Sequence, residues 1–167
     1  MRLTFSSNCA RGVALLALCG VAAVSFAQAM PKEGNYDYMS CYSGVDRASI
    51  STDSSHRAVI QEYTGSNKAA IPGTLLDMSS FQCIALVNSL GPKTARTSVC
   101  EAVDKDGDRT FTRFTGDGVI AENVFISGTG KYAGMERTGK AEYITFPAIK
   151  SGTFQTCVRQ TGTYKLK

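Results

Sequence analysis

Three carboxylates at alternate positions are the feature of this sequence best suited to chemistry. Asp104, Asp106 and Asp108 lie in the run Asp104-Lys105-Asp106-Gly107-Asp108. In a loop, side chains at this spacing can converge on one hard cation, and oxygen atoms are the ligands that calcium prefers. The spacing makes these three residues a candidate for a weak calcium site. The favoured interpretation is an acidic hairpin turn, because Asp and Gly both tolerate the backbone angles of a tight turn.

The same run resembles the opening of an EF-hand calcium loop, but only over its first five positions. The motif then has Gly, where this chain has Arg109, and it ends on a bidentate Glu, where this chain has Thr115. The flanking segments also alternate like strands, whereas an EF-hand is flanked by helices. These departures weaken the EF-hand interpretation. Calcium is the one cofactor that the acidic run suggests, and no other cofactor is expected.

A glycine-rich run, Gly128-Thr129-Gly130-Lys131-Tyr132-Ala133-Gly134, suggests a second kind of chemistry, because glycines let a backbone approach a phosphate closely. The phosphate-loop pattern is broken at two positions. Phe125 stands where the first Gly is required, and Tyr132 follows the Lys where Ser or Thr is required. A β-turn or bulge that joins two strands is the better prediction.

Candidate catalytic residues are few, and none is assigned. His56 is the only histidine, and it lies in a polar run that is typical of an exposed loop. Glu62, Glu101 and Glu122 fall within candidate strands, where outward, solvated carboxylates are the common case.

Three tyrosines near the start of the mature chain are candidates for lining a ligand cavity. Tyr36, Tyr38 and Tyr42 share one face of an extended segment, because side chains alternate along a strand with a period of two. A barrel wall or rim is the alternative position for them.

The first 29 residues form a predicted secretory signal peptide. Arg2 and Arg11 give a basic start, Gly12 to Val24 is an apolar run, and Ala27-Gln28-Ala29 has the form of a cleavage site. The run is shorter than the roughly 18 to 20 residues of a membrane-spanning helix, so no transmembrane segment is predicted. Lipid attachment at Cys19 is the alternative, and the bulky Leu18 before it argues against that reading. We expect export to the periplasm or the extracellular space.

Removal of 29 residues from 167 leaves 138, which suits a single domain at residues 30–167. The two arginines of the signal lower the formal net charge from +4 to +2. Because basic and acidic side chains are mixed along the remaining chain, no nucleic-acid partner is expected. The sequence leaves the oligomeric state undetermined.

Short alternating segments separated by Gly, Pro, Asn, Asp and Ser predict an all-β domain. The segment from Ser79 to Leu90 also fits a helix that stops at Gly91-Pro92. Eight strands suggest a closed antiparallel barrel or a sandwich, and we favour the barrel. The candidate strands are Asn35–Tyr42, Ala58–Tyr63, Phe81–Ser89, Thr97–Val103, Thr110–Phe114, Val119–Ile126, Ala141–Phe146 and Phe154–Tyr164.

Four cysteines remain after the signal, and in an exported domain they predict two disulfides with three possible pairings. If Gly91-Pro92 is the tip of a hairpin, Cys83 lies directly opposite Cys100, at bridging distance. The other pair, Cys41 with Cys157, then joins the first strand to the last, as neighbours in a closed barrel. A zinc site at these cysteines is disfavoured, because no closely spaced cysteine pair is present and His56 is the only histidine.

The glycine-rich run also carries a family resemblance. Ile126 to Met135, followed by Gly139 and Tyr143, resembles the turn of the allene oxide cyclase and dirigent barrel superfamily, and also uncharacterised exported bacterial proteins. The resemblance implies an eight-stranded antiparallel barrel around a central apolar cavity, and it carries over no catalytic residue. The function it suggests is noncatalytic binding of a small apolar or amphipathic ligand. The alternatives are an isomerase or cyclase-like enzyme that uses the same cavity, and a structural or protein-interaction module of the envelope.

Overall fold

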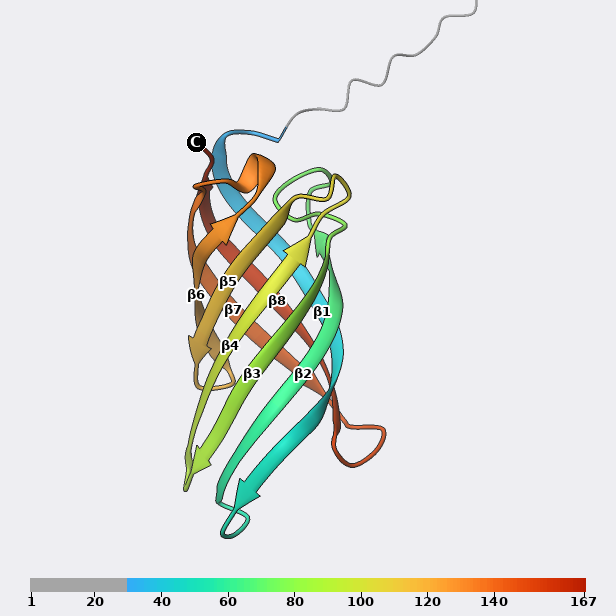
Figure 1. The fold of residues 1–167 in the computed structure, drawn as a ribbon, viewed down its shortest axis with the longest axis vertical. Coiled ribbons are helices and arrows are strands. Elements are labelled where there is room, and N and C mark those ends of the chain that lie inside the picture. Colours follow the sequence, from blue (N-terminus) through green and yellow to red (C-terminus); the bar gives the residue numbers. More distant parts are fainter. Residues whose placement is uncertain (1–29) are drawn as a thin grey trace, which may run out of the picture.

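Side chains that alternate between inward and outward positions mark most of the strands in residues 30–167, the part of the chain that the computed structural model describes. Each strand pairs antiparallel with its neighbour in sequence, and β1 pairs with β8 to close the barrel (Figure 1). This confirms the predicted all-β, eight-stranded barrel. The predicted signal peptide, including Cys19, lies outside the described residues. The strands are β1 (Glu33–Ser51), β2 (His56–Ala69), β3 (Ser80–Leu90), β4 (Lys93–Val103), β5 (Arg109–Gly116), β6 (Ile120–Gly128), β7 (Glu136–Phe146) and β8 (Thr153–Lys165).

The segment that also fitted a helix is strand β3. It forms a hairpin with β4 in which Leu90 lies opposite Lys93 and Cys83 lies opposite Cys100, as the hairpin reading requires. The turn residue Gly91 has φ +64°, a left-handed conformation that glycine adopts without steric cost. The strand interpretation of this segment is therefore confirmed, together with its register.

Both predicted disulfides are present. The Cα atoms are 4.1 Å apart in Cys83–Cys100 and 4.1 Å apart in Cys41–Cys157. Cys83 is buried and faces the barrel interior, whereas Cys41 is exposed on the outer surface. One bridge therefore joins the β3–β4 hairpin from inside, and the other fastens the closing seam between β1 and β8 from outside.

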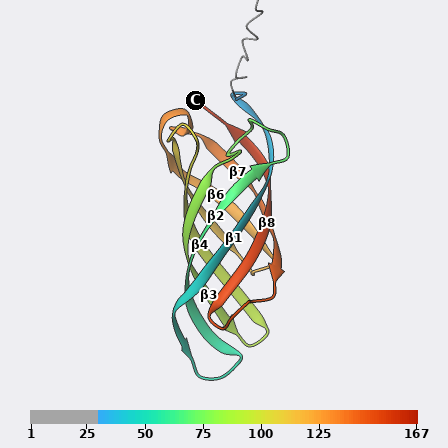
Figure 2. The same cartoon turned by 90° about the vertical axis from the view of Figure 1, so that its right-hand side faces the viewer.

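Several strands extend well beyond the segments that the sequence predicts. Strand β1 continues to Ser51 because β2 pairs with its second half, through a bulge between Asp46 and Ala48. The two strands project beyond the barrel as a long hairpin at the end opposite the C-terminus (Figure 2). Pairing partners, and not local alternation, determine these lengths.

Loops close the barrel at the end that carries the C-terminus, which we call the upper end (Figure 1). The β2–β3 loop, residues 70–79, inserts Leu75 and Leu76 into the core, where both are buried. The short 3-10 helix η1 (Gly130–Tyr132) joins β6 to β7 and buries Tyr132 in the same cluster. The described chain contains no helix that could serve as a membrane span.

A pair of glycines lets β7 and β8 approach each other under Tyr36. Gly139 lies opposite Gly162 in the β7–β8 ladder, and the Tyr36 hydroxyl lies over both. A methyl group at either position would collide with this hydroxyl and with a backbone carbonyl of the neighbouring strand. The close approach places Tyr36 where its hydroxyl bonds to Asn123 Oδ1 at 3.1 Å.

Candidate functional site

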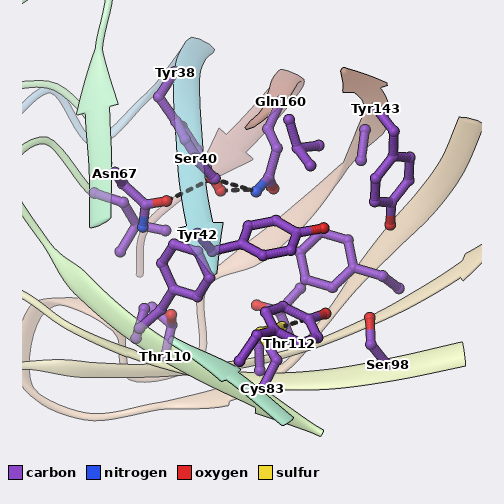
Figure 3. A pocket seen from close by; sticks show the side chains of 18 of the residues that line it. Tyr38, Ser40, Tyr42, Asn67, Cys83, Ser98, Thr110, Thr112, Tyr143 and Gln160 are labelled. Atoms are coloured by element: carbon purple, nitrogen blue, oxygen red, sulfur yellow. Dashed lines mark hydrogen bonds between the residues drawn. A yellow bond between two sulfur atoms is a disulfide. The ribbon is translucent and has the colours of Figure 1, made fainter. Parts of the chain in front are cut away.

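The barrel encloses a small cavity of about 40 Å³ that is lined by both aromatic and polar side chains (Figure 3). By the usual requirement of about 10 to 15 Å³ per water, this space holds about three waters. The lining side chains come from the inward positions of all strands but β6, and from the loop residue Leu76. The interior is thus largely filled, and its remaining space lies between a polar upper half and an aromatic lower half.

A chain of hydrogen bonds crosses the upper half of the cavity. The Arg137 guanidinium donates from Nη2 to the Tyr38 hydroxyl and, at 3.1 Å, to Gln160 Oε1. Tyr38 also donates to Gln160 Oε1, at 2.8 Å. Gln160 Nε2 donates to Ser40 Oγ at 2.8 Å, and Ser40 donates to Asn67 Oδ1 at 2.6 Å (Figure 3). Strands β7, β8, β1 and β2 each contribute to this chain, which fixes the side chains of the polar end.

The same chain of hydrogen bonds ends on the loop that closes the barrel. Asn67 Nδ2 donates to Ser79 Oγ at 2.8 Å, and Ser79 Oγ donates to the Leu76 carbonyl at 2.7 Å. Leu76 and Met78 both have φ of 56°, a left-handed conformation that costs a non-glycine residue about 1 kcal/mol or more. Asp77 between them compensates, because its carboxylate accepts bonds from the backbone N–H groups of Ala69 and Gly73.

Aromatic rings form the lower half of the cavity. The Tyr42 and Tyr63 rings stack at 4.4 Å between centroids, and Phe154 meets both rings edge-on. The half-buried Arg96 guanidinium lies 5.3 Å from the centroid of Tyr63 and 5.4 Å from that of Tyr143. Such contacts favour a cation electrostatically, and they leave its N–H groups available for other partners.

Several polar atoms around this space have no hydrogen-bond partner. The hydroxyls of Tyr42, Ser98 and Thr112 and Nε of Arg137 are unpartnered, and all four residues line the cavity. Nε and Nη2 of Arg96 are also unpartnered, but Arg96 packs on the Tyr63 ring and does not line the cavity. A buried polar atom without a partner costs about 1 to 3 kcal/mol. A set of them that faces one cavity indicates that another molecule, water or ligand, completes their bonding.

The ionisable side chains that line the cavity are four tyrosines and one arginine. Burial raises the pKa of Tyr38 to about 12 and that of Tyr143 to about 12, and it raises the pKa of Tyr42 as well. The lining includes no Asp, Glu or His, and its two cysteines are joined in a disulfide. These side chains are therefore equipped to bind a molecule by hydrogen bonds and aromatic contacts, and poorly equipped to exchange protons with it.

The three tyrosines singled out from the sequence all point inward. Tyr38 and Tyr42 line the cavity, one in each half. Tyr36 is buried above it, with its ring centroid 5.5 Å from that of Tyr38 and the Arg137 guanidinium 4.6 Å from its own centroid. It therefore packs against Arg137 without lining the cavity itself.

The acidic loop and the glycine-rich run, which look like two separate motifs in the sequence, contact each other at the upper end. Lys131 Nζ lies 2.6 Å from Asp104 Oδ2 and 2.5 Å from Asp106 Oδ2, and 3.9 Å from Asp108 Oδ2. The Tyr132 hydroxyl donates to Asp104 Oδ2 at 2.9 Å. Within residues 30–167 no three acidic, Cys or His side chains are arranged to hold a metal ion. Calcium binding at Asp104, Asp106 and Asp108 stays a prediction, and the ion would have to displace the Lys131 ammonium.

We expect Asp104→Asn to destabilise the protein by about 1 to 3 kcal/mol at neutral pH, because it removes the charged acceptor of the Tyr132 hydroxyl and the most buried of the carboxylates that pair with Lys131. Burial of the Asp104 carboxyl raises its pKa, but hydrogen bonds from Lys131 and Tyr132 outweigh this and hold the pKa below its usual value. Since the folded pKa is the lower one, this stability is present above the unfolded pKa, near 4, and is lost as pH falls through the folded pKa. Thermal unfolding of both proteins between neutral and acidic pH measures the difference.

The half-exposed Asp106 provides the control for this prediction. Its replacement by Asn should cost less than about 1 kcal/mol, as exposed ion pairs do. A difference between wild type and Asp104→Asn that is unchanged at low pH would contradict the role given to the Asp104 charge.

The other ionisable residues considered from the sequence lie outside the barrel. His56 occupies an exposed turn with its Nδ1 3.0 Å from the Asp53 carboxylate. Glu62 and Glu101 face outward and pair with Arg47 and Arg109, each at 2.6 Å. None of the sequence motifs identifies Arg137, Gln160 or Ser98. Each lies an even number of positions from an inward-facing apolar residue of the same strand, and so faces inward as well: Arg137 with Ala141, Gln160 with Val158, and Ser98 with Ala102.

Comparison with known proteins gives a likeness of fold alone. No family model matches this sequence. No curated protein matches it. The solved structure of a pterocarpan synthase dirigent protein superimposes with a TM-score of 0.50 at 9% identity, covering 81% of this chain and 93% of that chain. The resemblance to the dirigent barrel is thus confirmed as one of fold, whereas the likeness to allene oxide cyclases and to bacterial exported proteins stays a prediction.

Proposed function

We propose that this chain is an exported, noncatalytic binding protein that holds a small amphipathic molecule inside its barrel. The observation that carries the proposal is the set of unpartnered hydroxyls, Tyr42, Ser98 and Thr112, beside aromatic surface in one cavity. A molecule with polar atoms at one end and an apolar body would satisfy both kinds of surface. The two disulfides support export to the periplasm or the extracellular space, because such bridges persist in oxidising compartments.

An isomerase or cyclase-like enzyme that uses the same cavity is the second candidate. The convergence of Tyr38, Gln160 and Arg137 favours it, since a purely apolar lining would be expected of a simple carrier. Against it stands the lack of Asp, Glu and His among the lining side chains. These residues are the most frequent general acids and bases, so we prefer binding without turnover.

A protein-interaction module is the third candidate, and the outer surface offers one observation for it. Ile60 and Leu86 lie directly opposite each other on the outer face of β2 and β3, and Ile84 is 65% exposed two residues before Leu86. Such a patch is compatible with a partner surface. It lacks the unpartnered polar atoms that favour the interior as the binding site.

Native mass spectrometry of the protein purified from its exported compartment tests the proposal. We expect a noncovalent additional mass that is lost on denaturation and that is reduced in a Tyr42→Phe variant, in which one cavity hydroxyl is removed. Arg113→Gln, a change of an exposed residue on β5, is the control and should retain the mass. A bare polypeptide mass for the wild-type protein, together with no binding of added amphipathic molecules, would refute the proposed function.

A further inference from the structure

Arg137 is a buried charge without a countercharge. Its residue is 4% exposed, and no ion pair within residues 30–167 includes it. The cavity that it lines contains no Asp or Glu. The isolated burial of a guanidinium is costly, and proteins ordinarily place a carboxylate against it. Among residues 30–167 nothing supplies that carboxylate.

The neighbours of Arg137 orient its guanidinium without neutralising it. Tyr38 and Gln160 accept from Nη2, while the Tyr36 ring lies 4.6 Å away and the Tyr38 ring 5.5 Å away. These partners are neutral, because burial raises the pKa of the Tyr38 hydroxyl to about 12. Nε is buried and has no partner. The guanidinium is therefore held rigidly, with hydrogen-bonding capacity left for a further acceptor.

Water does not fully account for this arrangement. Water in the cavity can partner the hydroxyls of Ser98 and Thr112, because these groups need only a hydrogen bond. A neutral water cannot balance the charge of Arg137, whose cost is electrostatic and is relieved by an anion. The missing group is thus distinguished from solvent by its charge.

We propose that the molecule bound in the barrel carries a carboxylate, and that this carboxylate binds Arg137. The inference rests on the proposed function and specifies the chemical class of its ligand. A carboxylate oxygen can accept a charge-assisted hydrogen bond from the unpartnered Nε of Arg137, and the cavity of about 40 Å³ accommodates a group of that size. The apolar body then lies toward the Tyr42 and Tyr63 rings in the lower half of the barrel. Because the present space does not hold that body, side chains such as Leu76 must shift when it binds.

Titration calorimetry with octanoate and octanamide tests this assignment, since the two probes share a tail and differ in charge. We expect wild-type protein to bind octanoate about 10- to 100-fold more tightly than octanamide, the range of one charge-assisted hydrogen bond. Arg137→Met should remove this preference and bind the two probes about equally. Arg113→Met, which removes an exposed arginine of β5, should keep the preference of the wild type.

The outcomes separate this inference from the proposed function. Equal binding of both probes by wild-type protein, or a preference that survives in Arg137→Met, would overturn the carboxylate assignment and leave an amphipathic binding protein. Failure of the wild type to bind either probe would count against both. The wild-type comparison needs no variant, and Arg137→Lys, which keeps the charge, should retain a preference for octanoate if Arg137→Met does not fold.

Discussion

Removal of the Cys41–Cys157 disulfide, by Cys41→Ala with Cys157→Ala, should lower the free energy of unfolding by about 5 kcal/mol. The bridge joins residues 116 positions apart, whereas Cys83–Cys100 joins residues 17 apart, and chain-entropy loss in the unfolded state grows with loop length. The corresponding loss for the shorter bridge is about 3 kcal/mol. Denaturant unfolding of the two double variants measures both values.

The position of the longer bridge adds to its expected importance. It lies on the β1–β8 seam, the one pairing in the barrel that joins the two ends of the described chain. Reduced wild-type protein serves as the control and should match a variant that lacks all four cysteines. Equal losses for the two bridges, or a larger loss for Cys83–Cys100, would contradict the loop-length argument.

Gly162→Ala should destabilise the barrel by about 3 kcal/mol, toward the upper end of the usual cost of overpacking. A Cβ at this position would meet the Thr138 carbonyl oxygen and would lie 2.7 Å from the Cα of Gly139 and from the Tyr36 hydroxyl. Backbone atoms of a paired strand cannot yield without breaking the β7–β8 ladder. Thermal and denaturant unfolding measure the loss.

Gly34→Ala is the matched control for this substitution. At Gly34 the nearest atoms to an added Cβ belong to the Tyr164 ring, 3.7 Å away, an ordinary van der Waals distance. Replacement there should be neutral or should stabilise by up to about 1 kcal/mol, because alanine reduces the entropy of the unfolded chain. Similar effects at Gly34 and Gly162 would show that the close approach of β7 and β8 does not limit the barrel.

The fold could be predicted from the sequence because its first constraint is local and leaves a single pairing for the remaining two cysteines. Gly91-Pro92 fixes a hairpin tip, and once the tip is fixed the register brings Cys83 to Cys100 without further information. Closure then pairs Cys41 with Cys157. The second half of β1 was missed because its polar residues show no alternation, and only pairing with β2 makes it a strand.

The candidate site could be predicted only in part. The inward tyrosines follow from period-two alternation, but the same alternation makes Arg137 and Gln160 look like exceptions in otherwise apolar inner faces. A polar residue at an inward position is the available signal, but alternation alone does not distinguish it from an irregularity of the strand. The left-handed Leu76 had no signal, because its conformation depends on the Asp77 bonds to Ala69 and Gly73 that form only in the folded loop.

Closure of the barrel has a consequence for how copies of this protein behave when crowded together. Open sheets present a row of unpaired backbone donors and acceptors at each edge, and such edges recruit strands from other chains into aggregates. In residues 30–167 every strand has a neighbour on both sides, because β8 returns to β1. Within the closed part of the barrel, contacts between folded copies must therefore be made through side chains. One backbone edge that stays available is that of β1 beyond Val45, where β2 pairs with it and β8 does not.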